Sequence, residues 1–146
     1  MQPTAVILLS LLVGSLLSIY LPMNSMVSKH LGSAITANIT FFLMALVTSV
    51  ALFAVWGDNA TLARLKSVPA YLYLTGFVSA FIVLATTYLI PHLGVRRFFI
   101  LTISGQILTA MVVSHYGLLA TPTDPLSAKK IIGAALVVLG AVFSTL

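Results

Sequence analysis

The chain contains no cysteine and very few acidic residues. Among its 146 residues there are two acids, Asp58 and Asp124, against seven lysines and arginines and three histidines. Without cysteine there is no disulfide scaffold, no thiol chemistry and no cysteine-based metal site. The acids and histidines never occur at the spacing of metal ligands. We therefore expect no metal and no cofactor.

Charge of either sign is scarce, and this decides the class of protein. Only 6% of the residues are charged, compared with roughly 25% in soluble domains. Hydrophobic residues make up 60%, and the mean hydropathy is +1.17. The ten-residue alternation of a membrane β-barrel is absent. The composition predicts an all-α integral membrane protein. The net charge of +5 does not indicate nucleic-acid binding, because the basic residues flank apolar stretches, where they can meet lipid phosphates.

Five apolar stretches predict five transmembrane helices in a single membrane domain, residues 1–146. Pro22 and Pro91 are expected to end the first and third helices, because proline supplies no backbone donor. The run from Thr61 to Lys66 is predicted to form a short helix on the membrane surface. The first stretch lacks the positive start and cleavage site of a signal peptide, so we expect it to be retained. The predicted helices span residues 4–21, 33–56, 70–90, 97–116 and 128–146.

The basic residues are almost evenly divided between the two membrane faces that these helices define. The loops on one face carry Arg64, Lys66, Lys129 and Lys130, and those on the other carry Lys29, Arg96 and Arg97. An orientation is normally selected by an excess of Lys and Arg on one side. Near balance predicts dual topology, in which a copy pairs with an inverted second copy as an antiparallel homodimer. Pairing with a homologous subunit of fixed orientation remains an alternative.

Polar residues within the predicted helices are the candidates for substrate binding. Gln106 lies near the middle of the fourth helix, and Thr102 and Thr109 extend its stripe. An amide in hydrocarbon must find partners, so Gln106 either contacts substrate or makes an interhelical hydrogen bond worth roughly 0.6 kcal/mol. Ser79 and the threonines of the third helix could line an opposite wall, or bond back to their own helix.

Two further candidates lie around Pro22. Asn24 follows the predicted helix break, where irregular backbone is tolerated only within protein or beside a water-filled cavity; helix capping is the alternative role. Tyr20 either joins a pocket wall or acts as an interfacial aromatic residue. The candidate substrate-binding residues are Gln106, Asn24, Thr102, Thr109, Ser79 and Tyr20.

The histidines and a pair of arginines lie at the ends of the predicted helices. The histidines, His30, His92 and His115, are read as interfacial polar caps, although each could titrate near neutral pH. The pair Arg96-Arg97 either anchors lipid phosphate or draws anions toward a pathway.

The last helix carries a candidate interface between copies. Gly133 and Gly140, seven residues apart, with Ser144 beyond them, predict a smooth dimer interface. The five predicted helices also contain no acid. Cation and proton exchangers as small as this protein generally place a carboxylate in the membrane. The substrates are therefore expected to be neutral or anionic small metabolites or amphiphiles.

An ordered series of short motifs resembles one known family over nearly the whole chain. The first half contains Pro22-Met-Asn24, followed by Lys-His-Leu31-Gly-Ser, and the second contains Ile-Pro91-His-Leu-Gly94, Ser-Gly-Gln106, His115-Tyr-Gly-Leu-Leu and Pro125-Leu-Ser127. This set resembles the YdcZ-like, five-helix branch of the drug/metabolite transporter (DMT) superfamily. Two positions depart from the family pattern: Ser114 stands where an acid is usual, and Tyr20 where a Gln is common.

The resemblance implies a multi-pass protein of the bacterial inner membrane. It would be equivalent to one half of the ten-helix EamA-like transporters, whose halves are inverted repeats. The last helix is also similar to the dimer helix of small multidrug transporters, which supports the glycine interface.

The sequence therefore predicts a small membrane transporter that works as an antiparallel homodimer by alternating access. Its partners would be a small-molecule substrate, the lipid bilayer and a second copy, with no nucleic acid. A flippase-type carrier of a lipid-linked group and a non-transporting assembly subunit of a membrane complex are the alternatives. No nucleophile–base pair or acid–base couple is recognisable, so an enzyme is not expected.

Overall fold

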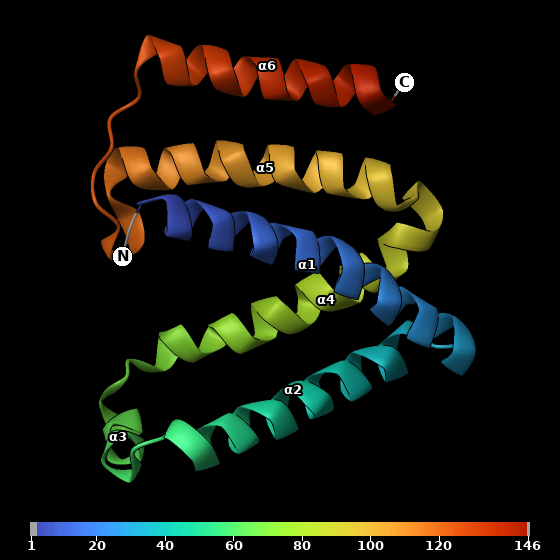
Figure 1. Cartoon of the computed structure of the whole chain (residues 1–146), viewed down its shortest axis with the longest axis vertical. Coiled ribbons are helices and arrows are strands. Elements are labelled where there is room, and N and C mark those ends of the chain that lie inside the picture. Colours follow the sequence, from blue (N-terminus) through green and yellow to red (C-terminus); the bar gives the residue numbers. More distant parts are fainter. Residues whose placement is uncertain (1–2, 146) are drawn as a thin grey trace. The chain divides into compact units, whose positions relative to one another are not determined.

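The computed structural model describes residues 3 to 145, which form helices and contain no strand. Five of these helical segments are long and apolar enough to cross a membrane, which confirms the predicted class of all-α integral membrane protein. They are α1, α2, the segment of η2 and α4, α5 and α6 (Figure 1). The elements are α1 (Pro3–Leu31), α2 (Ala34–Trp56), α3 (Asn59–Ala63), η1 (Arg64–Ser67), η2 (Ala70–Tyr73), α4 (Leu74–Leu93), α5 (Val95–Tyr116), η3 (Leu118–Ala120) and α6 (Ala128–Thr145). Leu146, the predicted last residue of the fifth helix, lies outside the described residues.

The two proline-containing helices end later in the chain than the sequence predicts. Helix α1 does not end at Pro22 but continues to Leu31, and α4 runs through Pro91 to Leu93. A proline removes one helical hydrogen bond. Ending the helix inside hydrocarbon would leave several backbone groups without water as a partner, which is more costly. The prediction that Asn24 lies at a helix break was therefore wrong, because Asn24 lies inside a continuous helix.

The other helix boundaries lie close to the predicted ones and have identifiable local causes. Ser33 caps α2, since its side chain accepts a 3.2 Å hydrogen bond from the Thr36 amide. Asp58 caps α3 in the same way through the Ala60 amide, at 2.9 Å. The short helix predicted after the second span is present as α3 followed by η1. Its position on the membrane surface remains a prediction.

The chain divides into two compact units, residues 1–92 and residues 93–146. In the first unit, burial is concentrated toward one end of the spanning helices. Residues 4–20 of α1 are all exposed, whereas Asn24 and Ser25 are buried. Helix α2 buries Ala37 near its start, and α4 buries residues only in its second half. Figure 1 shows α1 and α2 close together at their junction and diverging away from it. Much of the apolar surface of this unit is thus free to contact lipid or another chain.

The second unit is an antiparallel hairpin of α5 and α6 (Figure 1). Helix α5 ends at Gly117, whose φ of 60° provides the left-handed C-cap that glycine adopts without steric cost. The connecting loop folds back onto this end. The Asp124 amide donates to the Ser114 carbonyl at 2.8 Å, and Lys130 forms an ion pair with Asp124. On α6, Ala134 and Ala141 are buried, so small side chains allow the hairpin to close tightly.

Candidate functional site

A cluster of buried polar side chains lies in the first unit. The Asn24 Nδ2 atom donates a 2.7 Å hydrogen bond to Thr87 Oγ1, which joins α1 to α4. The Thr87 hydroxyl in turn donates to the Val83 carbonyl, at 2.7 Å. Asn24 is 7% exposed and Thr87 1%, and their sequence neighbours Ser25 and Thr86 are also buried. The structure thus pairs one predicted site residue, Asn24, with a threonine that the sequence analysis grouped only among possible wall residues.

Both helices that carry the cluster contain a proline close to it. Pro91 has no N–H for the carbonyl of Thr87, four residues earlier, and Pro22 has none for the carbonyl of Ser18. Each helix therefore has one backbone acceptor without its helical donor and one weakened turn. A buried hydrogen bond thus joins α1 and α4 close to the point where each can bend most easily.

The two other predicted residues of this unit lie around the cluster. Tyr20, one turn before Asn24 on α1, stacks on Phe41 of α2 with ring centroids 5.8 Å apart. Ser79 lies on α4 at helical spacing from Val83 and Thr86, so it shares their face, but it is exposed. The structure brings Tyr20 to the same side of α1 as Asn24 and leaves Ser79 at the more open end of that α4 face.

A residue that the sequence analysis did not single out, Asn38, is also part of this unit. Its Nδ2 atom donates to the Ala80 carbonyl at 3.3 Å, and its Oδ1 atom is buried with no hydrogen-bond partner among the described residues. The available signal was the amide itself, which interrupts an otherwise apolar run. Window-based hydropathy averages over such a residue.

The three predicted residues of the second unit share one face of α5. At 3.6 residues per turn, Thr102, Gln106 and Thr109 fall within an arc of about 60°. Leu108 and Met111, which line a groove shared with α6, lie on the opposite side of the helix. Gln106 and Thr109 are exposed, and Thr102 is partly buried with its hydroxyl bonded to the Phe98 carbonyl. The predicted polar stripe therefore exists and points away from α6.

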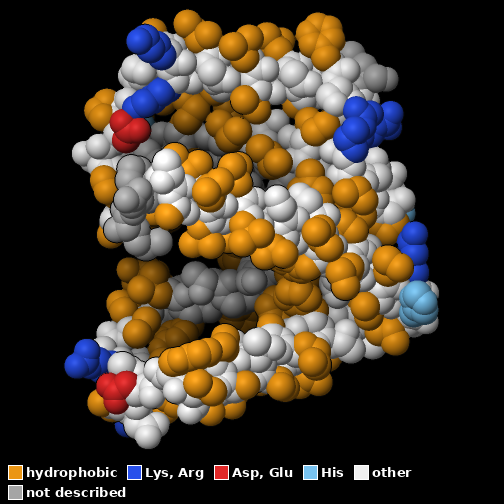
Figure 2. All heavy atoms as spheres, viewed as in Figure 1, with side chains coloured by type: hydrophobic (Ala, Val, Ile, Leu, Met, Phe, Trp, Pro, Cys, Tyr) orange, Lys and Arg blue, Asp and Glu red, His pale blue; other side chains and the backbone are white. Residues whose placement is uncertain are grey.

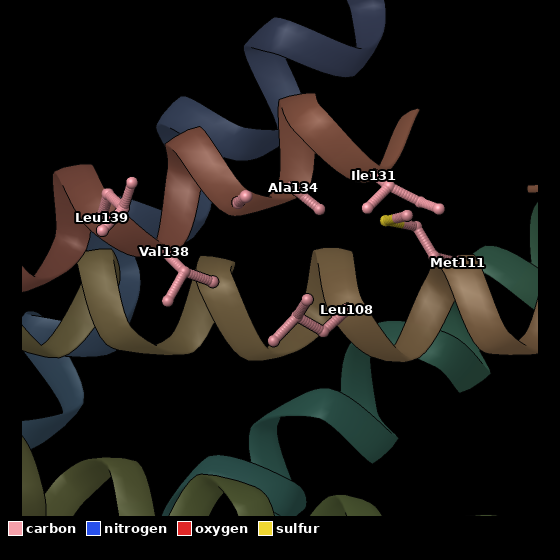
Figure 3. Close-up of a pocket in the computed structure, with 7 residues that line it drawn as sticks. Leu108, Met111, Ile131, Ala134, Val138 and Leu139 are labelled. Atoms are coloured by element: carbon pink, nitrogen blue, oxygen red, sulfur yellow. The ribbon is translucent and has the colours of Figure 1, made fainter. Parts of the chain in front are cut away.

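The groove between α5 and α6 is lined by apolar side chains and has a volume of about 500 Å³. Figure 3 shows side chains from both helices converging on it. Because none of its side chains can form a hydrogen bond, the groove cannot orient a polar solute. It is lined by Leu108, Met111, Ile131, Ala134, Ala135, Val138 and Leu139.

The predicted dimer residues of α6 fall into two environments. A Cβ atom added at Gly133 or Gly140 would have no neighbour within 4 Å, so both glycines lie on a free face of α6. Ser144 is partly buried, and its Oγ atom accepts a 2.8 Å hydrogen bond from the Arg96 guanidinium at the start of α5. Within this chain Ser144 therefore joins the two ends of the hairpin. The bond also engages one of the two arginines considered for drawing anions.

All seven basic residues lie at helix ends or in the segments between spans. In the first unit, Lys29 lies at the opposite end of α2 from Arg64 and Lys66. In the second unit, Arg96 and Arg97 begin α5, whereas the Lys129-Lys130 pair begins α6, at the other end of the hairpin. Figure 2 shows blue side chains at both ends of the helices of each unit, with orange apolar side chains between them. This distribution is the one expected for helices that span a bilayer.

Five apolar helices with charges confined to their ends define a multi-pass helical membrane protein. The sequence model of the family described as "Putative inner membrane exporter, YdcZ" matches residues 5–143, and the chain belongs to this family. The resemblance inferred from the motifs is thereby confirmed. Membership makes the chain an inner-membrane transporter. Searches of curated proteins and of solved structures returned no match.

Proposed function

We propose that this transporter works as an antiparallel homodimer, which moves neutral or anionic small metabolites or amphiphiles by alternating access. The observation that carries the proposal is the charge balance. Alternation of the five spans across the membrane would put four basic residues on one face and three on the other. Because orientation follows the Lys and Arg bias near the helix ends, this chain has almost nothing to select one orientation. Copies inserted both ways provide the two halves of an inverted pair.

The exposed helix faces support a second copy as the partner. Residues 4–20 of α1 are all exposed, and Ser10, Gly14 and Ser18 recur there at helical spacing. On α6, a Cβ atom added at Gly133 or Gly140 would meet no other described part of the chain within 4 Å. Small residues allow helices to approach closely in lipid, where van der Waals packing drives association. These faces are suited to contact with another helix.

The polar side chains of the two units supply the proposed substrate contacts. In the first unit these are Asn24 and Tyr20, with Ser79 on the facing helix. In the second unit they are Gln106, Thr102 and Thr109. The described parts of the spanning helices contain no acid, so a desolvated cation would find no counter-charge. Hydroxyl and amide groups suit neutral solutes and the neutral parts of anionic ones.

The weakened turns around Pro22 and Pro91 suit the proposed motion. Bending at these turns would let the outer parts of α1 and α4 move while the bond between Asn24 and Thr87 holds the helices together. Alternating access requires such a movement around a fixed site.

Complementation between oppositely biased variants tests the pairing. The first variant, Ala60→Lys with Leu62→Lys, changes the numbers of basic residues on the two faces from four and three to six and three. The second variant combines Arg64→Gln, Lys66→Gln and Leu31→Lys, and it changes these numbers to two and four. We expect each variant alone to lose transport and the two together to regain it, measured as metabolite efflux from proteoliposomes by mass spectrometry. Full activity of either variant alone would contradict inverted self-pairing.

A flippase-type carrier is the second candidate function, and one observation favours it. A second groove lies between α2 and α4 and is lined by Asn38, Ile39, Phe42, Leu43, Leu46 and Ala80. Asn38, at one end, is its polar residue, and the apolar lining is largely exposed at the protein surface. A lipid-linked group could keep its tail in such a groove while the polar part crosses. Flipping of a fluorescent lipid in proteoliposomes, measured by dithionite quenching, would distinguish this function from transport of free solutes.

A further inference from the structure

The groove between α2 and α4 has an apolar lining with one polar side chain, Asn38, whose Oδ1 atom is buried and has no partner among the described residues. We infer that it binds a neutral amphiphile, a molecule with a hydroxyl group at one end of an alkyl chain, and that Asn38 is the partner of this hydroxyl. The inference concerns a ligand site that lies within one unit of a single chain. It does not depend on how two copies pair.

The first observation is the amide oxygen of Asn38. This atom is buried and has no hydrogen-bond partner among the described residues. Nearly all buried polar atoms in proteins are paired, and an exception requires an explanation. The requirement is stricter in a membrane, where water cannot act as the missing donor. The Oδ1 atom therefore needs a hydrogen-bond donor, and the described part of the chain does not supply one.

The second observation is the space beside this amide. The groove has a volume of about 450 Å³, which falls within the range of roughly 300–1,000 Å³ usual for small-molecule sites. Asn38 is the one polar side chain in its lining, which otherwise consists of Ile39, Phe42, Leu43, Leu46 and Ala80. From Asn38 to Leu46 the groove follows α2 for about 12 Å, at 1.5 Å per residue. This shape suits an alkyl chain with a single polar end.

The amide can reach a ligand at little cost to the helices. Its present bond, from Nδ2 to the Ala80 carbonyl, is 3.3 Å long, beyond the usual range of about 2.7–3.2 Å. Helix α4 is continuous at this point, and Leu84 supplies the helical donor for the same carbonyl. A rotation of the Asn38 side chain would therefore not leave the Ala80 carbonyl unpaired. The rotated Oδ1 atom could then accept a hydrogen bond from the ligand.

The chemistry of the site selects a neutral donor. The described parts of the spanning helices contain no acid that could balance an ammonium group. A carboxylate or phosphate offers only acceptors, which could pair with Nδ2 of Asn38 but would leave its oxygen unpaired. A hydroxyl donates without carrying charge. Ile39, Leu43 and Leu46 are more than half exposed, so the groove opens at the protein surface, where an amphiphile can enter from the bilayer.

Photo-crosslinking of the full chain in lipid nanodiscs tests the site. The probe is 1-decanol carrying a diazirine in its chain, and the labelled residues are mapped by mass spectrometry. We expect labels on residues 39–46, and about tenfold stronger competition by 1-decanol than by decyl methyl ether, which has no donor. The factor corresponds to one hydrogen bond. Decanoate at alkaline pH should compete no better than the ether.

Three variants make the test specific. Asn38→Leu should abolish the preference for the alcohol over the ether. Thr48→Val should preserve it, because the Thr48 hydroxyl is exposed on the same helix and bonds to the Met44 carbonyl. Leu43→Trp, which fills the groove and leaves the amide intact, should reduce labelling by both probes. It also provides a test that does not depend on the folding of the Asn38 variant.

Several results would overturn the inference. Equal competition by alcohol and ether would show that only the alkyl chain of the probe associates with the groove, without a specific hydrogen bond. A preference that survives in the Asn38→Leu variant would assign the donor to another residue. Absence of labels from residues 39–46, together with weaker self-association of the Asn38→Leu variant measured by energy transfer, would identify a second copy of the chain as the occupant.

Discussion

Asn24 and Thr87, 63 residues apart in sequence, are joined by a 2.7 Å hydrogen bond between two buried side chains. The Thr87 hydroxyl accepts from the amide and donates to the Val83 carbonyl. Such polar contacts between spanning helices fix their relative position, because neither partner can turn to water. The bond also lies close to Pro22 and Pro91, where α1 and α4 are weakest. We therefore expect this bond to hold α1 and α4 together when either helix bends.

The strength of this bond can be measured by a double-mutant cycle with Asn24→Leu and Thr87→Val. We expect a coupling free energy of about 0.6–1.7 kcal/mol, the range found for hydrogen bonds between membrane helices. The measurement is the free energy of unfolding in mixed micelles. Thr48→Val, which removes an exposed hydroxyl, should change stability by less than about 0.5 kcal/mol. A coupling near zero would show that the bond contributes nothing to the packing of α1 on α4.

A side-chain hydrogen bond holds the loop before α6 to the end of α5 at His115. The His115 Nδ1 atom accepts a 3.2 Å hydrogen bond from the Leu126 amide. The ring is flanked by Tyr116, and the charged pair of Asp124 and Lys130 lies in the same loop region. His115→Leu removes the acceptor, so amide hydrogen exchange at Leu126 should be faster in this variant than in the unaltered protein.

His115→Asn supplies the control for this experiment, because its side-chain amide oxygen can also accept a hydrogen bond. Exchange at the Leu126 amide should accelerate less in His115→Asn than in His115→Leu. Equal acceleration in the two variants would show that the acceptor at this position does not protect the Leu126 amide.

Substitutions at a free position and at a buried position of α6 should separate pairing from folding. Gly140→Leu places a large side chain on the free face and should reduce the dimer population at least tenfold, with the hairpin intact. Ala141→Leu places the same side chain at a buried position and should cost about 1–3 kcal/mol of stability through overpacking. Dimerisation is measured by energy transfer between labelled copies, and stability by unfolding in micelles. Unchanged dimerisation of Gly140→Leu would exclude the glycine face as an interface.

The hydrogen bond between Arg96 and Ser144 should stabilise the open end of the hairpin. Ser144→Ala removes the acceptor without changing the charge balance, and it should cost less than about 1.5 kcal/mol. We expect a broader distance distribution between spin labels near the start of α5 and the end of α6, measured by pulsed electron resonance. A distribution identical to that of the unaltered protein would show that the bond does not hold these ends together.

The sequence was sufficient for the helices and less so for the contacts between them. Apolar length and charge spacing predicted all five spans, and the starts of α2, α5 and α6 lie within two residues of prediction. The errors occur at Pro22 and Pro91, where a rule that holds in water was applied to helices in hydrocarbon. There the missing solvent keeps the backbone helical past the proline.

The contacts within the candidate site were also only partly predictable from the sequence. Asn24 was singled out for a helix break that does not exist, yet its amide does take part in the buried cluster. Thr87 bonds back to its own helix, which was one of the two roles considered for it, but its second bond joins residues far apart in the chain. Nothing in a single sequence reveals such a pairing. Asn38 was missed because its environment, and not its spacing, makes it unusual.

The most direct test of the central claim is to determine the orientation of each copy in the membrane. The chain has no cysteine, so Ser67→Cys introduces a single thiol between α2 and α4 without background. An impermeant maleimide is added to intact spheroplasts, and the labelled fraction is compared with that after permeabilisation. The account predicts labelling of about half of the copies. Labelling of all copies, or of none, would contradict it.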